Sequence, residues 1–184
     1  GGNLQAPNLL GASGWISLDG GSHHGGDFNF RLSDPLPCQN SIALEAECAD
    51  AIGGRWTVMD DGAASNSQYL LPPNQTSYDY PPLNTEDLIR FQFDVEVSGH
   101  YRIYFRSQNA NGASDSYWVR TNYGNWVKWN RVNVDYYDNN FHWDQAGSWC
   151  GGGAAQAQTF YLEAGTNTLE VSWREPNALF DKVF

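Results

Sequence analysis

Two glutamates stand two positions apart in the first patterned stretch of the chain, residues 42–48. Apolar and polar residues alternate along this stretch, which is typical of a half-buried β-strand. On such a strand Glu45 and Glu47 share one face about 6–7 Å apart and repel each other by roughly 2–3 kcal/mol. A cation reverses that repulsion, and calcium accepts carboxylate and carbonyl oxygens in irregular geometry. The spacing alone leaves two interpretations, a structural calcium site or two solvated glutamates on an edge strand.

A third acid, Asp181, stands in the last apolar stretch, residues 178–184. A carboxylate among apolar neighbours costs free energy unless a partner compensates it. We therefore expect Asp181 to be paired with another group of the protein.

The elements that position these acids are short strands. Apolar and polar residues alternate in most of them, and turn-forming residues separate them. We expect hairpin turns at Ser98-Gly99, Tyr123-Gly124-Asn125 and Ala164-Gly165. No helical pattern intervenes, so the sequence predicts an all-β fold of two antiparallel sheets packed as a sandwich. The expected strands are 42–48, 68–71, 89–97, 101–105, 114–120, 126–129, 158–163, 166–174 and 178–184.

Composition narrows the possible functions. The chain has 184 residues and a formal net charge of -11, which argues against nucleic acid as a ligand because phosphates are bound largely by lysine and arginine. The same charge argues against an anionic membrane surface, and no apolar stretch is long enough for a membrane span. Residues 1–5 do not have the pattern of a signal peptide.

The first part of the chain differs from the rest in composition. Residues 1–40 are rich in Gly, Ser, Asn and Asp and have no sustained period, so we expect an irregular N-terminal arm or linker. Residues 41–184 are expected to form the sandwich. The arm could also dock on a neighbouring molecule by adding a strand to its sheet.

The three cysteines, Cys38, Cys48 and Cys150, do not have the spacing of zinc ligands. Cys38 and Cys48 are close enough in the sequence to form a disulfide, which would fix the start of the first strand and contribute about 2–4 kcal/mol. The alternative is that the cysteines are buried free thiols. A disulfide would indicate an oxidising, extracellular or cell-surface location.

A set of short motifs recurs in a characteristic order along residues 41–184. Together they resemble the β-sandwich carbohydrate-binding modules of families six and thirty-five, which have a galactose-binding-like jelly-roll fold, and in particular the variant found in secreted bacterial proteins. The motifs are Leu44-Glu45-Ala46-Glu47, Gly54-Arg55-Trp56, residues 64–69, residues 115–119, Trp126 with Trp129, Arg174-Glu175 and residues 179–183.

The resemblance implies a structural calcium ion held by Glu45, Glu47 and Asp181. It also implies a sugar cleft in the loops at one end of the sandwich, with an aromatic wall at Tyr69 and another at Phe141 or Trp143. In the family an asparagine usually stands two residues before the last-strand aspartate. Here that position is Leu179, so the usual cleft could be silent or altered.

Two further residues are candidates for a sugar cleft, which generally combines aromatic faces with a few polar groups. Trp118 is expected on the face of its strand opposite Tyr117 and Val119, where it could be exposed. Asn111 lies in the polar loop 109–112.

The sequence has no motif of a serine hydrolase, a zinc protease or a phosphate-binding loop, so we do not expect an enzyme. The main hypothesis is a secreted, non-catalytic module that is stabilised by calcium and binds polysaccharide or glycan. The alternative is a structural or adhesive module that assembles with copies of itself, or with other domains of a larger protein, through its N-terminal arm.

Overall fold

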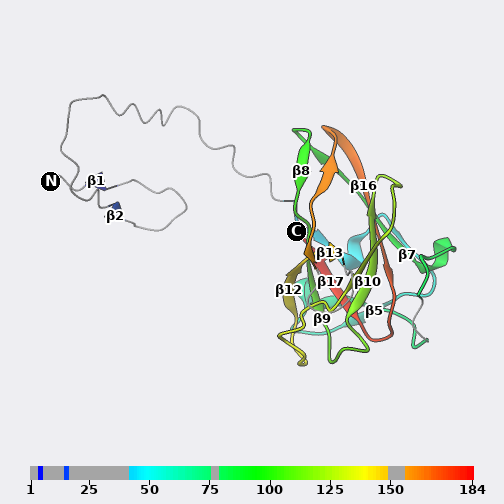
Figure 1. The fold of residues 1–184 in the computed structure, drawn as a ribbon. Helices are drawn as coiled ribbons and strands as arrows, with labels where there is room; N and C mark the ends of the chain where they lie inside the picture. Colours follow the sequence, from blue (N-terminus) through cyan, green and yellow to red (C-terminus); the bar gives the residue numbers. More distant parts are fainter. Residues whose placement is uncertain (1–3, 6–14, 17–41, 76–78, 149–155) are drawn as a thin grey trace, which may run out of the picture. The chain divides into compact units, whose positions relative to one another are not determined.

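The structure is a computed structural model that describes residues 4–5, 15–16, 42–75, 79–148 and 156–184. The chain divides into two units, Gly1–Pro37 and Cys38–Phe184. In the first unit the structure describes strands β1 (Leu4–Gln5) and β2 (Trp15–Ile16), which pair antiparallel. The second unit contains the sandwich (Figure 1).

One layer of the sandwich is a five-stranded antiparallel sheet in the order β11-β10-β16-β7-β4. Strand β16 lies at its centre and pairs with β7 from Gly165 to Ser172 and with β10 from Leu169 to Trp173. The strands are β4 (Ala51–Ile52), β7 (Leu88–Val95), β10 (Ser116–Thr121), β11 (Val127–Asn130) and β16 (Gly165–Trp173).

The other layer is a six-stranded antiparallel sheet in the order β12-β9-β17-β6-β5, with β3 also paired to β17. Its strands are β3 (Leu44–Glu45), β5 (Thr57–Asp60), β6 (Gln68–Leu71), β9 (Tyr104–Gln108), β12 (His142–Gln145) and β17 (Leu179–Val183). Two smaller pairs complete the described strands: β8 (Gly99–Tyr101) with β15 (Phe160–Leu162), and β13 (Gly147–Ser148) with β14 (Gln156–Ala157). The prediction of an all-β, two-sheet antiparallel sandwich is confirmed.

Aromatic side chains from both sheets fill the space between the layers. The ring of Phe105 lies 5.0 Å from those of Trp129 and Phe180, measured between centroids. Leu169, Val171 and Trp173 alternate inward along β16 as the sequence indicates, and all three are fully buried. Burial of side chains of this size provides most of the driving force that holds the two sheets together.

Two of the three expected hairpins are wrong. Strand β7 pairs with β16 and β4, whereas β9 pairs with β12 and β17 in the opposite sheet, so Ser98-Gly99 belongs to a crossing between the layers. Ala164-Gly165 likewise joins strands of different sheets, because β15 pairs with β8 and β16 pairs with β7 and β10. Alternation identifies a strand but carries no information about its partner. The hairpin at Tyr123-Gly124-Asn125 is confirmed by the pairing of β10 with β11.

The expected strand 42–48 is shorter than predicted. It ends at Glu45, and Ala46–Cys48 form the 3-10 helix η1. Glu45 and Glu47 therefore do not share the face of one strand, and Cys48 is exposed instead of lying on the buried face. Cys38 and Cys150 lie outside the described residues, so the pairing of Cys38 with Cys48 stays a prediction.

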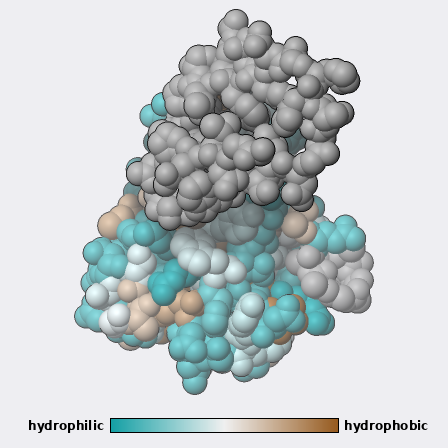
Figure 2. Space-filling model, turned by 90° about the vertical axis from the view of Figure 1, so that its left-hand side faces the viewer, coloured by the Kyte–Doolittle hydropathy of each residue, from teal (hydrophilic) through white to brown (hydrophobic). Residues whose placement is uncertain are grey.

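The surface of the described unit mixes polar and apolar residues. On the face shown in Figure 2, hydrophobic residues form small patches among hydrophilic ones. In the described parts of the chain, no helix has the length and apolar character needed to cross a membrane.

Candidate functional site

A tight turn at Ser65–Ser67, the 3-10 helix η2, brings the three acids singled out by the sequence together. The backbone N–H of Ser65 donates to Asp181 Oδ1 at 2.8 Å, and its hydroxyl donates to Glu45 Oε1 at 3.0 Å. The side-chain amide of Asn66 donates to Glu47 Oε1 at 2.8 Å. Asn66 has φ of 50°, a conformation that asparagine tolerates better than most residues. The acids thus converge on this turn, which we call the Ser65 cluster.

Asp181 has the partner that its position demands. Its side chain is fully buried, and Arg106 forms an ion pair with its Oδ2 while donating to the backbone oxygen of Ala63 at 3.0 Å. Burial raises the pKa of Asp181, and Arg106 opposes that rise. Both carboxylate oxygens of Asp181 are therefore engaged, one by Arg106 and one by Ser65.

The two glutamates of the Ser65 cluster each keep one oxygen without a protein partner. Lys182 Nζ lies 2.5 Å from Glu45 Oε1, but Glu45 Oε2 and Glu47 Oε2 are buried and have no hydrogen-bond partner among the described residues. Such oxygens fit a hard cation such as calcium. Within the described part of the chain, however, no three Asp, Glu, His or Cys side chains come close enough to share one metal ion.

The expected cleft aromatics Tyr69 and Phe141 lie in contact. Their ring centroids are 5.6 Å apart at an angle of 55°, and the guanidinium of Arg106 lies 5.2 Å from the Phe141 centroid. Phe141 is only 9% exposed. Burial raises the pKa of the Tyr69 hydroxyl, and the charge of Asp61 adds to that effect. The two rings touch each other and leave no space for a sugar ring between them.

Leu179, which replaces the expected asparagine, begins β17 and is half-buried. Its backbone oxygen accepts a hydrogen bond from the buried hydroxyl of Tyr117 at 3.1 Å. Its side chain offers no hydrogen-bonding group to a sugar. In the expected cleft, the rings of Tyr69 and Phe141 therefore contact each other, and the side-chain amide of the usual asparagine is absent because Leu179 stands in its place.

Trp143 has a different setting. It belongs to the edge strand β12 and is 45% exposed, the highest value among the tryptophans whose side chains the structure describes. One edge of it contacts Phe184, with centroids 6.1 Å apart and planes at 70°. It lines a hollow of about 170 Å³, which we call the Trp143 hollow. The other lining residues include Arg131, Asn133, Asp135, Tyr136, Asp144 and Gln145.

Hydrogen bonds hold the polar wall of the Trp143 hollow in place. Asp144 accepts from the backbone N–H of Asn133 at 2.9 Å and from that of Gln145 at 2.8 Å. Burial raises the pKa of Asp144, and these two N–H groups partly oppose the rise. Tyr136 stacks on His142 with centroids 4.6 Å apart and planes at 19°. An aromatic face and fixed donors and acceptors thus meet in one opening, the combination that saccharide recognition uses.

Trp118 is buried, contrary to the expectation that it could be exposed. It is only 6% exposed because residues 80–84 lie over it, and it lines a second hollow of about 270 Å³. Asn111 is exposed in its loop, where its side-chain oxygen accepts from the backbone N–H of Ala113 at 2.8 Å. The structure therefore separates the sequence candidates into several places: Tyr69 with Phe141, Trp143 at an edge strand, Trp118 under residues 80–84, and Asn111 in a loop.

A buried carboxylate connects the loop of Asn111 with the loop that lines the Trp143 hollow. Asp115 is 1% exposed, and the hydroxyl of Tyr137 donates to its Oδ2. Its backbone N–H donates to Glu175 Oε2 at 3.0 Å. Burial and the nearby charge of Glu175 raise the pKa of Asp115 to about 6, although the Tyr137 hydrogen bond opposes the rise.

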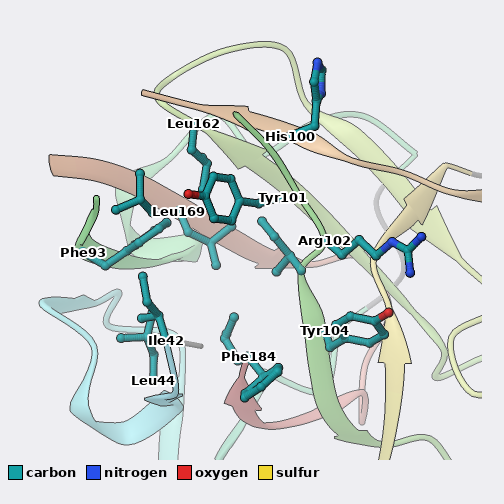
Figure 3. A pocket seen from close by; sticks show the side chains of 13 residues that line it. Ile42, Leu44, Phe93, His100, Tyr101, Arg102, Tyr104, Leu162, Leu169 and Phe184 are labelled. Carbon is teal, nitrogen blue, oxygen red and sulfur yellow. The ribbon is translucent and has the colours of Figure 1, made fainter. Parts of the chain in front are cut away.

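A third hollow, of about 590 Å³, has no character of a sugar site. It opens between the two sheets near the Gly165 end of β16, and most of its lining side chains are apolar. Tyr101 and Leu162 point into it, whereas the polar ends of His100 and Arg102 point away (Figure 3). Few groups there could exchange hydrogen bonds with sugar hydroxyls.

No protein-family model matches the sequence, and no curated protein matches it. Solved structures do match. A family 35 carbohydrate-binding module from Clostridium thermocellum superposes with a TM-score of 0.56 at 22% identity, over 78% of this chain and 96% of that one. The chain has the fold of a family 35 carbohydrate-binding module. A family 35 module from an environmental isolate matches this fold at 11% identity with a TM-score of 0.53, over 78% of this chain and 91% of that one.

The family 35 fold also occurs joined to enzymes. The chain matches part of a GH26-CBM35 β-(1,4)-mannanase from Podospora anserina, with a TM-score of 0.54 at 20% identity, over 77% of this chain and 26% of that one. The resemblance inferred from the motifs of the sequence is thus confirmed at the level of fold.

Sequence reasoning found Trp143 but not the residues around it. Arg131, Asp135 and Tyr136 lie in the connection between β11 and β12, which has no strand or helix pattern. The one available signal was composition, because aromatic and acidic residues gather in the short segment 135–138.

Proposed function

We propose that this chain is a non-catalytic module that binds carbohydrate through the Trp143 hollow. The observation that carries the proposal is the exposed indole of Trp143 beside hydrogen-bonded polar side chains. The family 35 fold supports it, since the chain spans nearly the whole length of a family 35 carbohydrate-binding module. That correspondence also favours a binding role over a catalytic one.

In this proposal the apolar face of a pyranose ring lies on the Trp143 indole. Asp144 and Gln145 line the same opening and would exchange hydrogen bonds with the ring hydroxyls, and Arg131 would donate to hydroxyl or ring oxygens. Asp144 is held by two backbone N–H groups, so little side-chain freedom is lost on binding. The affinity of one such site is modest, and repeated attachment to a polymer would increase it.

The test is binding of soluble oligosaccharides to wild type and to Trp143→Ala. Calorimetric titration with mannohexaose, β-1,3-galactotriose, cellohexaose and xylohexaose should find at least one ligand, and Trp143→Ala should weaken its binding at this hollow at least about tenfold. The matched control is Tyr161→Ala, which removes another exposed aromatic ring, on β15. No binding by the wild type to any of these sugars, or equal affinity in Trp143→Ala, contradicts the proposal.

We also propose that calcium stabilises the Ser65 cluster. The support is the pair of partnerless buried oxygens on Glu45 and Glu47, and the charge balance of three carboxylates against Arg106 and Lys182. Glu45 and Glu47 would hold the ion. Asp181, the third ligand implied by the resemblance, would orient the Ser65 turn through its hydrogen bond to the backbone. A bound ion adds stability because it binds the native state and not the unfolded chain.

Chelation tests the calcium proposal. We expect the melting temperature to fall when EDTA replaces calcium, and Glu47→Gln to make the protein insensitive to that exchange. Glu96→Gln, a change at an exposed glutamate, should retain the wild-type response. An identical melt of the wild type with calcium and with EDTA contradicts the site.

We also propose that the protein acts outside the cell or at its surface, because that is where a module of this role would meet polysaccharides. The alternative of assembly through the N-terminal arm rests on residues that lie largely outside the described ones, and it stays a prediction.

A further inference from the structure

The second hollow, which we call the Trp118 hollow, lies at the outer face of the five-stranded sheet. Tyr117 and Val119 point into the core, so Trp118 between them points outward, where residues 80–84 cover it. This covering segment contains two consecutive prolines, whose fixed φ angles limit how closely it can follow the sheet. A hollow of about 270 Å³ remains between the segment and the strands.

One wall of the Trp118 hollow carries an ion pair. Arg55 Nη1 lies 3.2 Å from Asp87 Oδ1, and the two side chains are 39% and 9% exposed. The backbone oxygen of Asp87 accepts a hydrogen bond from the Trp56 indole at 3.0 Å, which fixes the position of the residue. Burial raises the pKa of Asp87, and Arg55 opposes that rise. The guanidinium donors of Arg55 and the carboxylate acceptor of Asp87 thus lie side by side, and the pair carries no net charge.

The other wall is apolar and open to solvent. Tyr80 is 81% exposed and Leu83 is 93% exposed, and both line the hollow. An aromatic ring that stands free beside a fixed donor and acceptor is the arrangement that accommodates a sugar, with C–H groups against the ring and hydroxyls at the polar pair.

We propose that the Trp118 hollow is a second saccharide site, specific for neutral sugars. The proposal rests on the carbohydrate-binding function above and extends it to two sites. Tyr80 covers the apolar face of the sugar ring, and Arg55 and Asp87 bind its hydroxyls. Neutral sugars are favoured because Arg55 is already neutralised by Asp87 and the chain carries a formal net charge of -11.

The two sites lie on different sheets. The Trp143 hollow is at edge strand β12 of the six-stranded sheet, and the Trp118 hollow is against β10 and β16 of the five-stranded sheet. One module therefore binds two polysaccharide chains, or two segments of one chain. Two linked sites raise the apparent affinity for a polymer by about 10²–10⁴-fold over either site alone when both can engage together.

The experiment is an NMR titration of ¹⁵N-labelled protein with the neutral oligosaccharides named above and, as an acidic comparison, with an oligogalacturonate. We expect the indole N–H signals of both Trp118 and Trp143 to shift with the neutral sugar, with separate binding curves. Tyr80→Ala should weaken the Trp118 curve about tenfold and leave the Trp143 curve unchanged. Tyr161→Ala, which removes an exposed ring elsewhere, should change neither curve.

The outcomes separate the two proposals. No shift of either indole with any sugar overturns carbohydrate binding altogether. A shift of Trp143 alone, or a Trp118 curve unaffected by Tyr80→Ala, overturns the second site and leaves the first. A Trp118 shift produced only by the acidic oligosaccharide, or only by a proline-rich peptide run in parallel, overturns the neutral-sugar assignment.

Discussion

Asp181 and Asp115 are both buried carboxylates with raised pKa values, but their partners differ. Asp181 lies in the six-stranded sheet between the guanidinium of Arg106 and the backbone N–H of Ser65. Asp115 lies near Glu175, and the hydroxyl of Tyr137 is the side-chain donor that it meets. Burial raises the pKa of both groups, but a neighbouring cation opposes the rise at Asp181, whereas a neighbouring acid adds to it at Asp115.

The two carboxylates also differ in their relation to the Trp143 hollow, the proposed sugar site. Asp181 links β17 to the Ser65 turn and so fixes part of the frame. Asp115 holds Tyr137, which belongs to the same connection as Arg131 and Tyr136 of the Trp143 hollow. A change in protonation at Asp115 therefore acts on the loop that lines the site.

The largest expected effect on the free energy of unfolding comes from breaking the ion pair between Asp181 and Arg106. Asp181→Ala leaves the Arg106 guanidinium without its carboxylate, and removing one partner of a buried pair typically costs about 3–5 kcal/mol. Chemical denaturation should show this loss in the free energy of unfolding, while Glu96→Ala at an exposed position should change it by less than about 0.5 kcal/mol. A small effect of Asp181→Ala would show that the pair does not hold the frame.

A smaller, pH-dependent effect is expected at Asp115. Its pKa in the native state is about 6, above the ordinary 3.8, so the native state binds this proton more tightly than the unfolded chain does. The resulting stabilisation is present at low pH and is lost as the pH rises from about 4 to 6, by at most about 3 kcal/mol. Asp115→Asn should remove this component.

The measurement is the free energy of unfolding of wild type and Asp115→Asn at pH 4.5 and at pH 7.5. Relative to the wild type, the free energy of unfolding of the variant should be higher at pH 7.5 than at pH 4.5. Asp135→Asn, in the same region but exposed, serves as the control. A wild-type-minus-variant difference that does not depend on pH would remove the contrast between the two carboxylates.

The fold class and much of the frame could be predicted from the sequence. Alternation in β7, β10 and β16 identified strands and their buried faces, because one face of each packs into the core. It could not assign partners: the short segments at Gly99 and Gly165 look like hairpin turns but join strands of different sheets. Local sequence does not distinguish a tight turn from a crossing.

The sites were harder to predict, because exposure depends on tertiary packing. Trp118 and Trp143 both lie on strands, yet residues 80–84 cover the first and leave the second open. The partner of Asp181 was also out of reach, since Arg106 is 75 positions away in the chain and meets it through the pairing of β9 with β17.

The central claim is that a sugar ring lies on Trp143. Intermolecular NOEs between protons of a bound oligosaccharide and the Trp143 indole test it most directly. We predict NOEs from the ring C–H protons of the sugar to Trp143, together with NOEs to side chains of the adjoining hollow such as Gln145. A bound sugar whose protons contact Tyr69 and Phe141, with none near Trp143, would contradict the account.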